Sequence, residues 1–335
     1  MNYYTKEGYI RYSAVIDPRY PFTVIYGGRG VGKTYGILQY CIENKIPFIY
    51  MRHSQSMVEQ LGTDALNPTK AVFNDMGENC SVKKSGKYIY RFVYGEKLEN
   101  ECGIMVALST FSNLRGFDAS DYKILIFDEF IPQEEVKRRK NDGLSFLNAI
   151  ETISRNRELQ GRPPILTFLL TNANTLNSDI LIQLNLFDSV LQMQEEGSEI
   201  YFDKARGLQV FRPKSKISEQ KRKTSLYKFA GDGRFSSVNL DNEFQRPDAE
   251  IRKVDTKGWK CVACIKDLAN IYKKGKRYYI STHKSGHPVE YIFDKKGKIL
   301  FIRNYPDFLI AIAEKRAIFQ TLKLYYQISL ELSIE

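Results

Sequence analysis

Apolar and polar positions follow two patterns over the first 196 residues, where short β-branched or aromatic runs are separated by stretches with helical periodicity. The runs that predict strands are Thr23–Tyr26, Ile46–Met51, Gly103–Leu108, Lys123–Phe127 and Ile165–Leu170. Most of these runs are almost continuously apolar, which is typical of strands buried on both faces of a parallel sheet. With the intervening helices covering that sheet, residues 1–196 are predicted to form an α/β domain.

Two further regions depart from this pattern. Residues Ser81–Tyr90 alternate about a Ser-Gly turn, which predicts a β-hairpin inserted between the second and third strands. From 197 to 250 the chain is mostly polar and contains a basic run and the turn Gly231–Gly233. We therefore interpret residues 197–250 as a linker segment or a small linking domain.

Residues 251–335 are predicted to form a small α+β domain. The predicted strands are Trp259–Ile265, Arg277–Thr282, Pro288–Phe293 and Ile299–Arg303. A helical pattern follows them over Phe308–Phe319. A nuclease needs clustered carboxylates that hold metal ions, and the first of these strands contains none. Nuclease activity is therefore not expected here.

Positive charge is concentrated at the end of the chain. The 335 residues contain 50 Lys and Arg against 39 Asp and Glu, a formal charge of +11. Residues 201–335 hold 28 of the basic and 15 of the acidic residues, so the excess lies in this part. Nucleic acid, an anionic surface and a phosphorylated ligand are the partners that such charge favours. The basic runs Lys137–Lys140, Lys221–Lys223 and Lys273–Arg277 could bind phosphate backbones, although each alone could also be a solvated loop.

Cysteine use and hydropathy indicate a reducing, cytosolic setting. Five scattered cysteines are too few for a disulfide framework in a chain of this length. No apolar run reaches bilayer length and the first residues lack a signal-peptide pattern, so we expect neither secretion nor a membrane span. Cys261 and Cys264 lie in a predicted strand, where residues three apart point to opposite faces, and we interpret them as packing residues rather than zinc ligands.

One stretch matches the pattern of a phosphate-binding loop, and its members are Gly27, Gly28, Arg29, Gly30, Val31, Gly32, Lys33 and Thr34. The stretch lies between a predicted strand and a predicted helix, as the binding mechanism requires. Its backbone N–H groups would surround the phosphates of ATP. Lys33 would neutralise charge on the β- and γ-phosphates, and the Thr34 hydroxyl would coordinate Mg²⁺.

An acidic pair supplies the second half of the predicted site. Asp128 and Glu129 follow the apolar run 124–127, so they lie at the carboxyl end of a buried strand, where such folds bind nucleotides. We expect Asp128 to complete the Mg²⁺ site and Glu129 to polarise the attacking water. A second carboxylate favours hydrolysis over kinase chemistry because a hydrolase needs a base for water.

Two other polar positions allow two interpretations each. Thr171 and Asn172 end the next apolar strand, where they could contact the γ-phosphate or form an Asx turn before a helix. Arg155 ends an amphipathic helical pattern, where it could complement the helix dipole or reach the γ-phosphate bound by a neighbouring subunit.

These motifs together resemble the DNA-packaging ATPases of phi29-like phages over nearly the whole chain. The segments that carry the resemblance are Gly27–Thr34, Phe127–Phe130, Arg155–Glu158, Thr171–Ala173, Ser218–Thr224 and Leu240–Phe244. Leu114–Gly116 is similar to a segment of the wider class of large terminases.

The resemblance implies a P-loop ATPase of the additional-strand, catalytic-glutamate type. It implies a homo-oligomeric ring, expected to be a pentamer, that drives double-stranded DNA into a procapsid through the portal in the host cytoplasm. The resemblance also adds a packaging RNA to the candidate partners. The resemblance also implies that Arg155, with Arg157 as the alternative, acts in trans and that Asn172 couples hydrolysis to movement. It implies that the C-terminal domain is similar to a nuclease fold without an active site. Another P-loop translocase or helicase, or a non-enzymatic nucleic-acid adaptor, is the alternative function.

Overall fold

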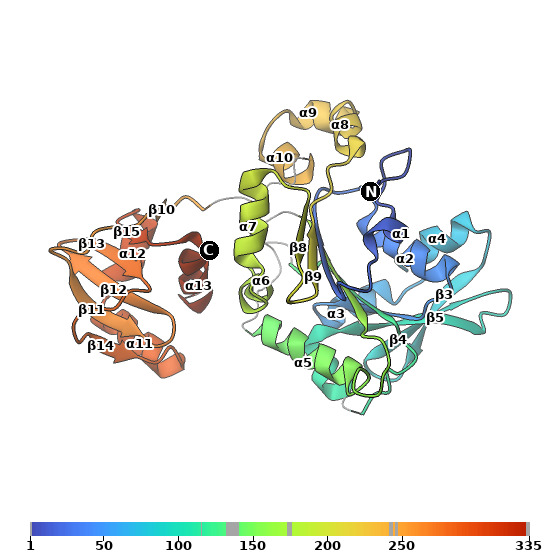
Figure 1. Ribbon diagram of the computed structural model, residues 1–335, viewed down its shortest axis with the longest axis horizontal. Helices are drawn as coiled ribbons and strands as arrows, with labels where there is room; N and C mark the ends of the chain where they lie inside the picture. The colour runs from blue at the N-terminus through green and yellow to red at the C-terminus, as the bar shows by residue number, and fades with distance from the viewer. Residues whose placement is uncertain are drawn as a thin grey trace. The chain divides into compact units, whose positions relative to one another are not determined.

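The computed structural model describes residues 2–114, 116–131, 141–172, 176–240, 244 and 247–332. The chain divides into two compact units (Figure 1). The first contains the described parts of 1–175 and 183–245, and the second those of 176–182 and 246–335. The basic run Lys137–Lys140 lies outside the described residues.

The first unit is built on a nine-stranded sheet with the order β3-β4-β5-β2-β6-β7-β1-β9-β8. The strands are β1 Phe22–Tyr26, β2 Phe48–Arg52, β3 Cys80–Ser85, β4 Ile89–Tyr94, β5 Asn100–Ala107, β6 Ile124–Asp128, β7 Leu166–Thr171, β8 Ile200–Asp203 and β9 Leu208–Phe211. The neighbours from β5 to β9 in this order are parallel, whereas the pairs β3–β4, β4–β5 and β8–β9 are antiparallel. This confirms the predicted α/β class, the five predicted strands and the hairpin.

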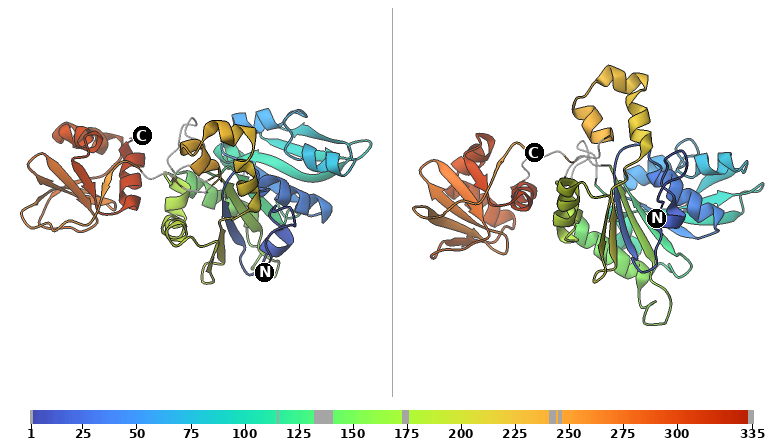
Figure 2. Two further views of the ribbon diagram at one scale, coloured as in Figure 1. Left: turned by 90° about the horizontal axis from the view of Figure 1, so that it is seen from above. Right: turned by 45° about the horizontal axis from the view of Figure 1, so that its top comes forward.

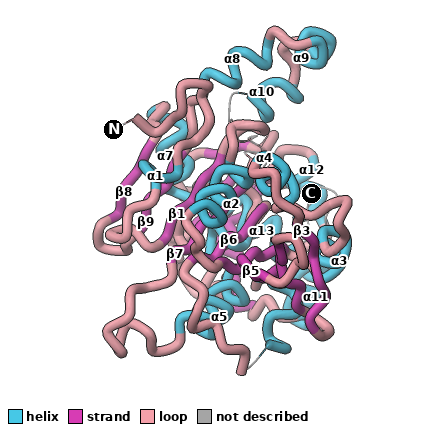
Figure 3. The backbone as a smooth tube through the Cα atoms, turned by 90° about the vertical axis from the view of Figure 1, so that its right-hand side faces the viewer, coloured by secondary structure: helices cyan, strands magenta, loops and turns pink. Residues whose placement is uncertain are grey.

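Helices cover both faces of this sheet (Figures 1 and 3). One face packs in a single core with α1 Tyr12–Val15, α2 Lys33–Glu43, α3 Gln55–Leu61 and α4 Lys70–Asp75. On the other face, the rings of Phe127 in β6 and Phe146 in α5 (Asp142–Ser154) lie 5.2 Å apart. Tyr26 in β1 donates a hydrogen bond to the Val190 carbonyl in α7 (Phe187–Glu196). Alternate residues of the buried strands therefore pack into the two cores on opposite faces of the sheet, which explains why these strands are almost continuously apolar.

Strand order positions the functional residues. β7 lies between β1 and β6 and pairs in parallel with both. The strand that leads into the glycine-rich loop and the strand that ends in the acidic pair are therefore separated by one additional strand. The carboxyl ends of all three meet at one edge of the sheet.

The segment 197–250 is more structured than a linker. Strands β8 and β9 extend the large sheet, with β9 parallel to β1 and all four of its residues buried. Three short helices follow, α8 Lys216–Arg222, α9 Ser225–Ala230 and α10 Arg234–Leu240, and form the helical cluster seen in Figure 2. The prediction missed the strands because four-residue runs among polar residues carry little periodicity.

The second unit contains a six-stranded mixed sheet with the order β10-β15-β13-β12-β11-β14. The strands are β10 Glu250–Ile251, β11 Lys260–Ile265, β12 Ala269–Lys274, β13 Arg277–Ser281, β14 Val289–Tyr291 and β15 Ala317–Phe319. Its helices are α11 Lys295–Asn304, α12 Asp307–Ala313 and α13 Leu322–Leu332, and α6 Asp179–Gln183 falls mostly in the segment 176–182.

Two predictions for this unit were wrong. Ile299–Arg303 lies in helix α11 rather than a strand, because Asp294 caps the helix by accepting the Gly297 N–H (2.7 Å). The predicted helix Phe308–Phe319 divides into α12 and strand β15. In α11, Phe301 is buried, with its ring 5.2 Å from that of Phe308. Helix α11 therefore buries this side chain against α12.

We predict that Asp294→Ala lowers the free energy of unfolding by about 1 kcal/mol, because it removes the N-cap of α11. Chemical denaturation of the full chain measures this change. Lys296→Ala is the control, since it changes charge in the same turn without removing a capping hydrogen bond. Equal stability of the two variants would contradict the capping role.

Candidate functional site

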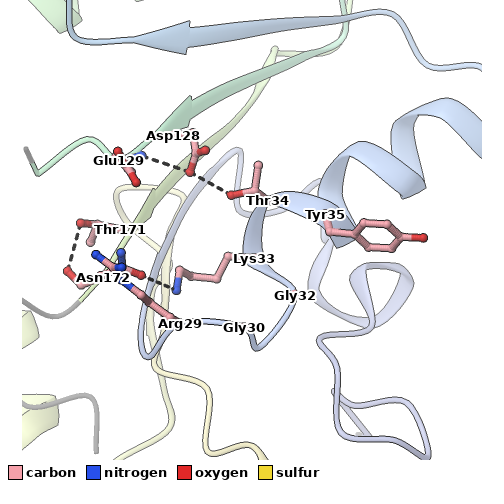
Figure 4. A pocket seen from close by; sticks show the side chains of 10 residues that line it. All are labelled: Arg29, Gly30, Gly32, Lys33, Thr34, Tyr35, Asp128, Glu129, Thr171 and Asn172. Atoms are coloured by element: carbon pink, nitrogen blue, oxygen red, sulfur yellow. Dashed lines mark hydrogen bonds between the residues drawn. The ribbon is translucent and has the colours of Figure 1, made fainter. Parts of the chain in front are cut away.

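A cavity of about 360 Å³ lies where β1, β6 and β7 end (Figure 4). Its lining residues are Arg29, Gly30, Gly32, Lys33, Thr34, Tyr35, Asp128, Glu129, Thr171 and Asn172. The structure thus brings the glycine-rich loop, the acidic pair and the polar end of β7 to one place, although they are far apart in sequence.

The loop turns sharply from β1 into α2, and glycine permits the turn. Gly30 and Gly32 have φ values of +83° and +87°, in the left-handed region that favours glycine. Gly32 is also the N-cap residue of α2. The Gly27 N–H donates to the Thr171 carbonyl at the end of β7 (3.2 Å), which anchors the start of the loop. The helix N-terminus and adjoining loop therefore border the cavity as an anion site requires.

Lys33 lies beneath this loop with only 9% of its surface exposed. Its Nζ donates to the carbonyls of Gly27 (2.8 Å) and Gly28 (2.7 Å) and to Asn172 Oδ1 (3.0 Å). Burial lowers the pKa of Lys33 to about 7; Asp128 opposes this shift, whereas the charges of Lys221 and Arg29 add to it. A phosphate group beside this ammonium would stabilise its charged form.

Thr34 and Asp128 meet as a Mg²⁺ site would need. Thr34 Oγ1 donates to Asp128 Oδ1 (3.1 Å), and both residues line the cavity. Hydroxyl and carboxylate oxygens suit Mg²⁺, which binds through one or two protein ligands together with substrate phosphates and water. The donor set and its place beside the loop therefore fit the ion.

Two residues of β2 that the sequence analysis missed hold the acidic pair. Tyr50 donates to Asp128 Oδ2 (2.6 Å), and Arg52 pairs with both Asp128 (3.2 Å) and Glu129. Burial raises the pKa of the Tyr50 hydroxyl well above its ordinary value, and the Asp128 charge adds to this effect. Since β2 is parallel to β6, polar residues at the end of the second predicted strand were the available signal.

Asn172 is directed toward the ammonium group of Lys33. Its Oδ1 accepts the hydrogen bond from Lys33, while the Thr171 hydroxyl donates to the Asn172 carbonyl (3.1 Å). The structure therefore places both residues in the cavity, as the γ-phosphate interpretation requires. The following Ala173 and Asn174 lie outside the described residues.

Arg155 does not line the cavity of its own chain. It caps the C-terminus of α5, is exposed, and donates to the Phe117 carbonyl (2.7 Å). Arg157, two residues further on, donates to the carbonyl of Tyr122 just before β6 begins, so Arg155 lies near the edge of the sheet opposite the cavity. Arg157 is buried and donates to the carbonyls of Ser120 (3.2 Å) and Tyr122 (3.1 Å), which gives it a structural role.

Two lysines of the predicted basic runs have partners inside the protein. Lys221 Nζ donates to the Arg29 carbonyl in the glycine-rich loop (2.5 Å). Lys273 forms an ion pair with Asp307 (3.1 Å). These two lysines are thus engaged within their own units.

Comparison with known proteins assigns the chain to a family. The family model described as Podovirus DNA encapsidation protein (Gp16) matches residues 9–267, well over half of the chain. The chain belongs to the Podovirus DNA encapsidation protein (Gp16) family. The resemblance to phi29-like packaging proteins is therefore confirmed, and the chain is a DNA encapsidation protein. A comparison with curated protein sequences gives no match.

Two solved structures support the fold of this family member. One is of the Phi-28 gp11 DNA packaging motor, with 16% identity, a TM-score of 0.62 and coverage of 97% of each chain. The other is of the bacteriophage Phi-29 viral genome packaging motor assembly, with 16% identity, a TM-score of 0.63 and coverage of 95% of this chain and 98% of that one. At this identity the likeness shows a shared fold across both units.

We predict that ATP binding takes up a proton above pH 7. With its pKa at about 7, Lys33 is mostly neutral at about pH 8.5, and bound phosphates raise that pKa so that the lysine becomes charged. Titration calorimetry in buffers of different ionisation enthalpy should show uptake of about one proton per ATP at that pH, and less near pH 6.

The Lys33→Arg variant is the control for this measurement. Arginine stays protonated across the range, so the variant reports only the protons of ATP itself. Identical proton uptake by the natural chain and this variant would contradict the assignment to Lys33.

Proposed function

We propose that this family member binds ATP with Mg²⁺ in the cavity and hydrolyses it to translocate double-stranded DNA into a procapsid through the portal. The observation that carries the proposal is the convergence of Lys33, the Thr34–Asp128 pair and Glu129 on one cavity. Membership of a DNA encapsidation family supplies the substrate class.

The residues divide the chemistry among them. Loop amides and Lys33 bind the β- and γ-phosphates, which holds the terminal phosphate beside Asn172. Thr34 and Asp128 would hold Mg²⁺, which would neutralise charge that develops on the phosphates. Glu129 accepts the proton of the attacking water. The Glu129 carboxylate forms an ion pair with Arg52. To accept this proton it must either use its other oxygen or break the ion pair.

Arg155 acts on the site of a neighbouring subunit. Its exposed position at the opposite edge of the sheet from the cavity supports a role in trans rather than in its own site. A closed ring, which we take to be a pentamer, would give each cavity one such arginine. Hydrolysis would then depend on ring geometry, and Asn172 would transmit the state of the γ-phosphate to the rest of the subunit.

The remaining parts serve contacts with the packaging machinery. Residues 201–335 carry the excess positive charge, which supports contact with phosphate backbones without base preference. We take the second unit to be a nuclease-like domain without activity, because its strand β11 contains none of the carboxylates that a two-metal nuclease site needs. The portal and a packaging RNA are further partners, in the host cytoplasm. Within the described chain, no helix has the length and apolar character of a membrane span.

We predict that Glu129→Gln lowers the kcat of DNA-stimulated ATP hydrolysis by about 10²–10⁴-fold, because the general base is lost. Affinity for ATP should change little, since Glu129 is not a phosphate ligand. Steady-state hydrolysis and a nucleotide-binding assay measure the two effects.

The same preparation distinguishes packaging from the alternatives. DNA-stimulated hydrolysis without strand separation supports a packaging motor, whereas strand separation would indicate a helicase. An adaptor would show no turnover. Hydrolysis that persists in Glu129→Gln would remove the proposed catalytic assignment.

We predict that Arg155→Ala and Glu129→Gln subunits complement one another when mixed. An arginine that acts in trans allows an intact Glu129 of one subunit to meet an intact Arg155 of the next, so part of the lost ATPase activity returns. Each variant alone should be nearly inactive. Absence of recovery in rings that contain both variants would contradict a role in trans.

A further inference from the structure

A second lysine reaches the phosphate-binding loop from helix α8. Lys221 Nζ donates to the carbonyl of Arg29 (2.5 Å), while Lys33 Nζ donates to the carbonyls of Gly27 and Gly28 just before it. Two ammonium groups therefore bind three consecutive carbonyl oxygens of one loop. The sequence analysis assigned Lys221 instead to a basic run that could contact nucleic acid.

The loop is shaped to admit this lysine. A Cβ atom on Gly30 would lie 2.3 Å from Lys221 Nζ, so any side chain larger than hydrogen would displace the lysine. On the other side, the Arg29 N–H donates to the Asn239 carbonyl in α10 (3.2 Å). Both backbone polar groups of Arg29 are thus held by the helical cluster α8–α10.

Helix α8 is itself anchored, so Lys221 projects from a fixed base. Ser215 caps the helix by accepting the Ile217 N–H (3.1 Å), and its hydroxyl donates to the Gly8 carbonyl (2.5 Å). Ile217 is buried. The helix position is therefore set by contacts other than the lysine, and the Lys221 side chain can change partners without moving the helix.

The charges at this loop favour a polyanion. Asp128 and Glu129 pair with Arg52, and among the described residues no carboxylate forms an ion pair with Lys33 or Lys221. Burial lowers the pKa of Lys221, and the nearby charge of Arg29 adds to the effect. Arg29, Lys33 and Lys221 thus bring three cations to one loop, more than a single carboxylate could neutralise.

We propose that Lys221 is a second phosphate-binding lysine, whose ammonium moves from the Arg29 carbonyl to an oxygen of the γ-phosphate when ATP occupies the loop. The proposal rests on ATP binding at this loop, the function proposed above. A charge-assisted hydrogen bond to phosphate is stronger than one to a neutral carbonyl, which drives the exchange.

The position of Lys221 selects the γ-phosphate. The amides around Gly32 at the start of α2 suit the β-phosphate, since they lie at the helix N-terminus. The next phosphate then lies toward Lys33 Nζ and Asn172, which hydrogen-bond to one another across the start of the loop. Arg29 lines the cavity and its carbonyl binds Lys221, whereas Lys221 is not itself a lining residue, so its ammonium reaches a phosphate only by leaving that carbonyl.

Two substitutions in the full chain test the proposal. Lys221→Ala removes the ammonium, and Lys221→Gln keeps a donor for the Arg29 carbonyl but loses the charge. The probes are ADP and a non-hydrolysable ATP analogue, each with Mg²⁺, measured by titration calorimetry. Both variants should lose about tenfold in affinity for the analogue but less than about twofold for ADP.

The matched control is Lys223→Ala, which removes an equal charge from an exposed position at the C-cap of α8. This control should bind both nucleotides as the natural chain does. Unchanged affinity in Lys221→Gln, or equal losses for ADP and the analogue, would overturn the proposal. Weaker DNA binding with unchanged nucleotide binding would also overturn it, and would instead indicate that Lys221 contacts the phosphate backbone of DNA.

Lys33→Ala separates this failure from failure of the proposed function. If it loses affinity for both nucleotides while the Lys221 variants do not, ATP binding at the loop stands and only the role of Lys221 fails. If Lys33→Ala binds both nucleotides as the natural chain does, the nucleotide site itself is wrong.

Discussion

A buried ammonium group, that of Lys33, is the feature around which the candidate site is organised. A charged group removed from water must be compensated, and here loop carbonyls and Asn172 compensate it through hydrogen bonds, while the charge of Asp128 adds to this effect without a direct ion pair. This arrangement holds the loop around the lysine while leaving its charge available to phosphates. The left-handed glycines and the anchor at Thr171 maintain the same geometry.

The strand order makes this compensation possible. Because β7 separates β1 from β6, its last residue is followed by Asn172 directly beside Lys33, while Asp128 reaches Thr34 from the far side. Strand β2 adds Tyr50 and Arg52 on the outer side of Asp128. Four parallel strands thus each contribute one part of the site, and none of them could form it alone.

The sequence was most informative where chemistry demands particular residues at fixed spacing. The glycine-rich loop and the acidic pair could be located because each follows a four-residue run that predicts a buried strand, and both line the cavity. Arg52 and Tyr50 escaped prediction because their role depends on which strands are neighbours, which local periodicity does not reveal. The contact between Lys221 and Arg29 also escaped prediction, because the two residues are 192 positions apart and the basic run alone allowed either a backbone contact or a solvated loop.

In the second unit, the local apolar pattern led to wrong predictions of secondary structure. The apolar run at Ile299–Arg303 suits a strand, but Asp294 at the preceding turn caps a helix, and Phe301 packs against Phe308. Capping and tertiary packing thus decided between two structures that the apolar pattern alone allowed. Tertiary structure also accounts for the short strand β15. Its three residues pair in parallel with β13, a contact that the local apolar pattern does not reveal.

A structure of the protein with Mg²⁺ and a non-hydrolysable ATP analogue tests the central claim most directly. We expect the triphosphate within the Gly27–Thr34 loop, with Lys33 Nζ against its β- and γ-phosphates. We expect the metal beside Thr34 and Asp128, and the Glu129 carboxylate within one water of the γ-phosphorus. A triphosphate bound elsewhere, or a Glu129 carboxylate directed away from it, would contradict the account.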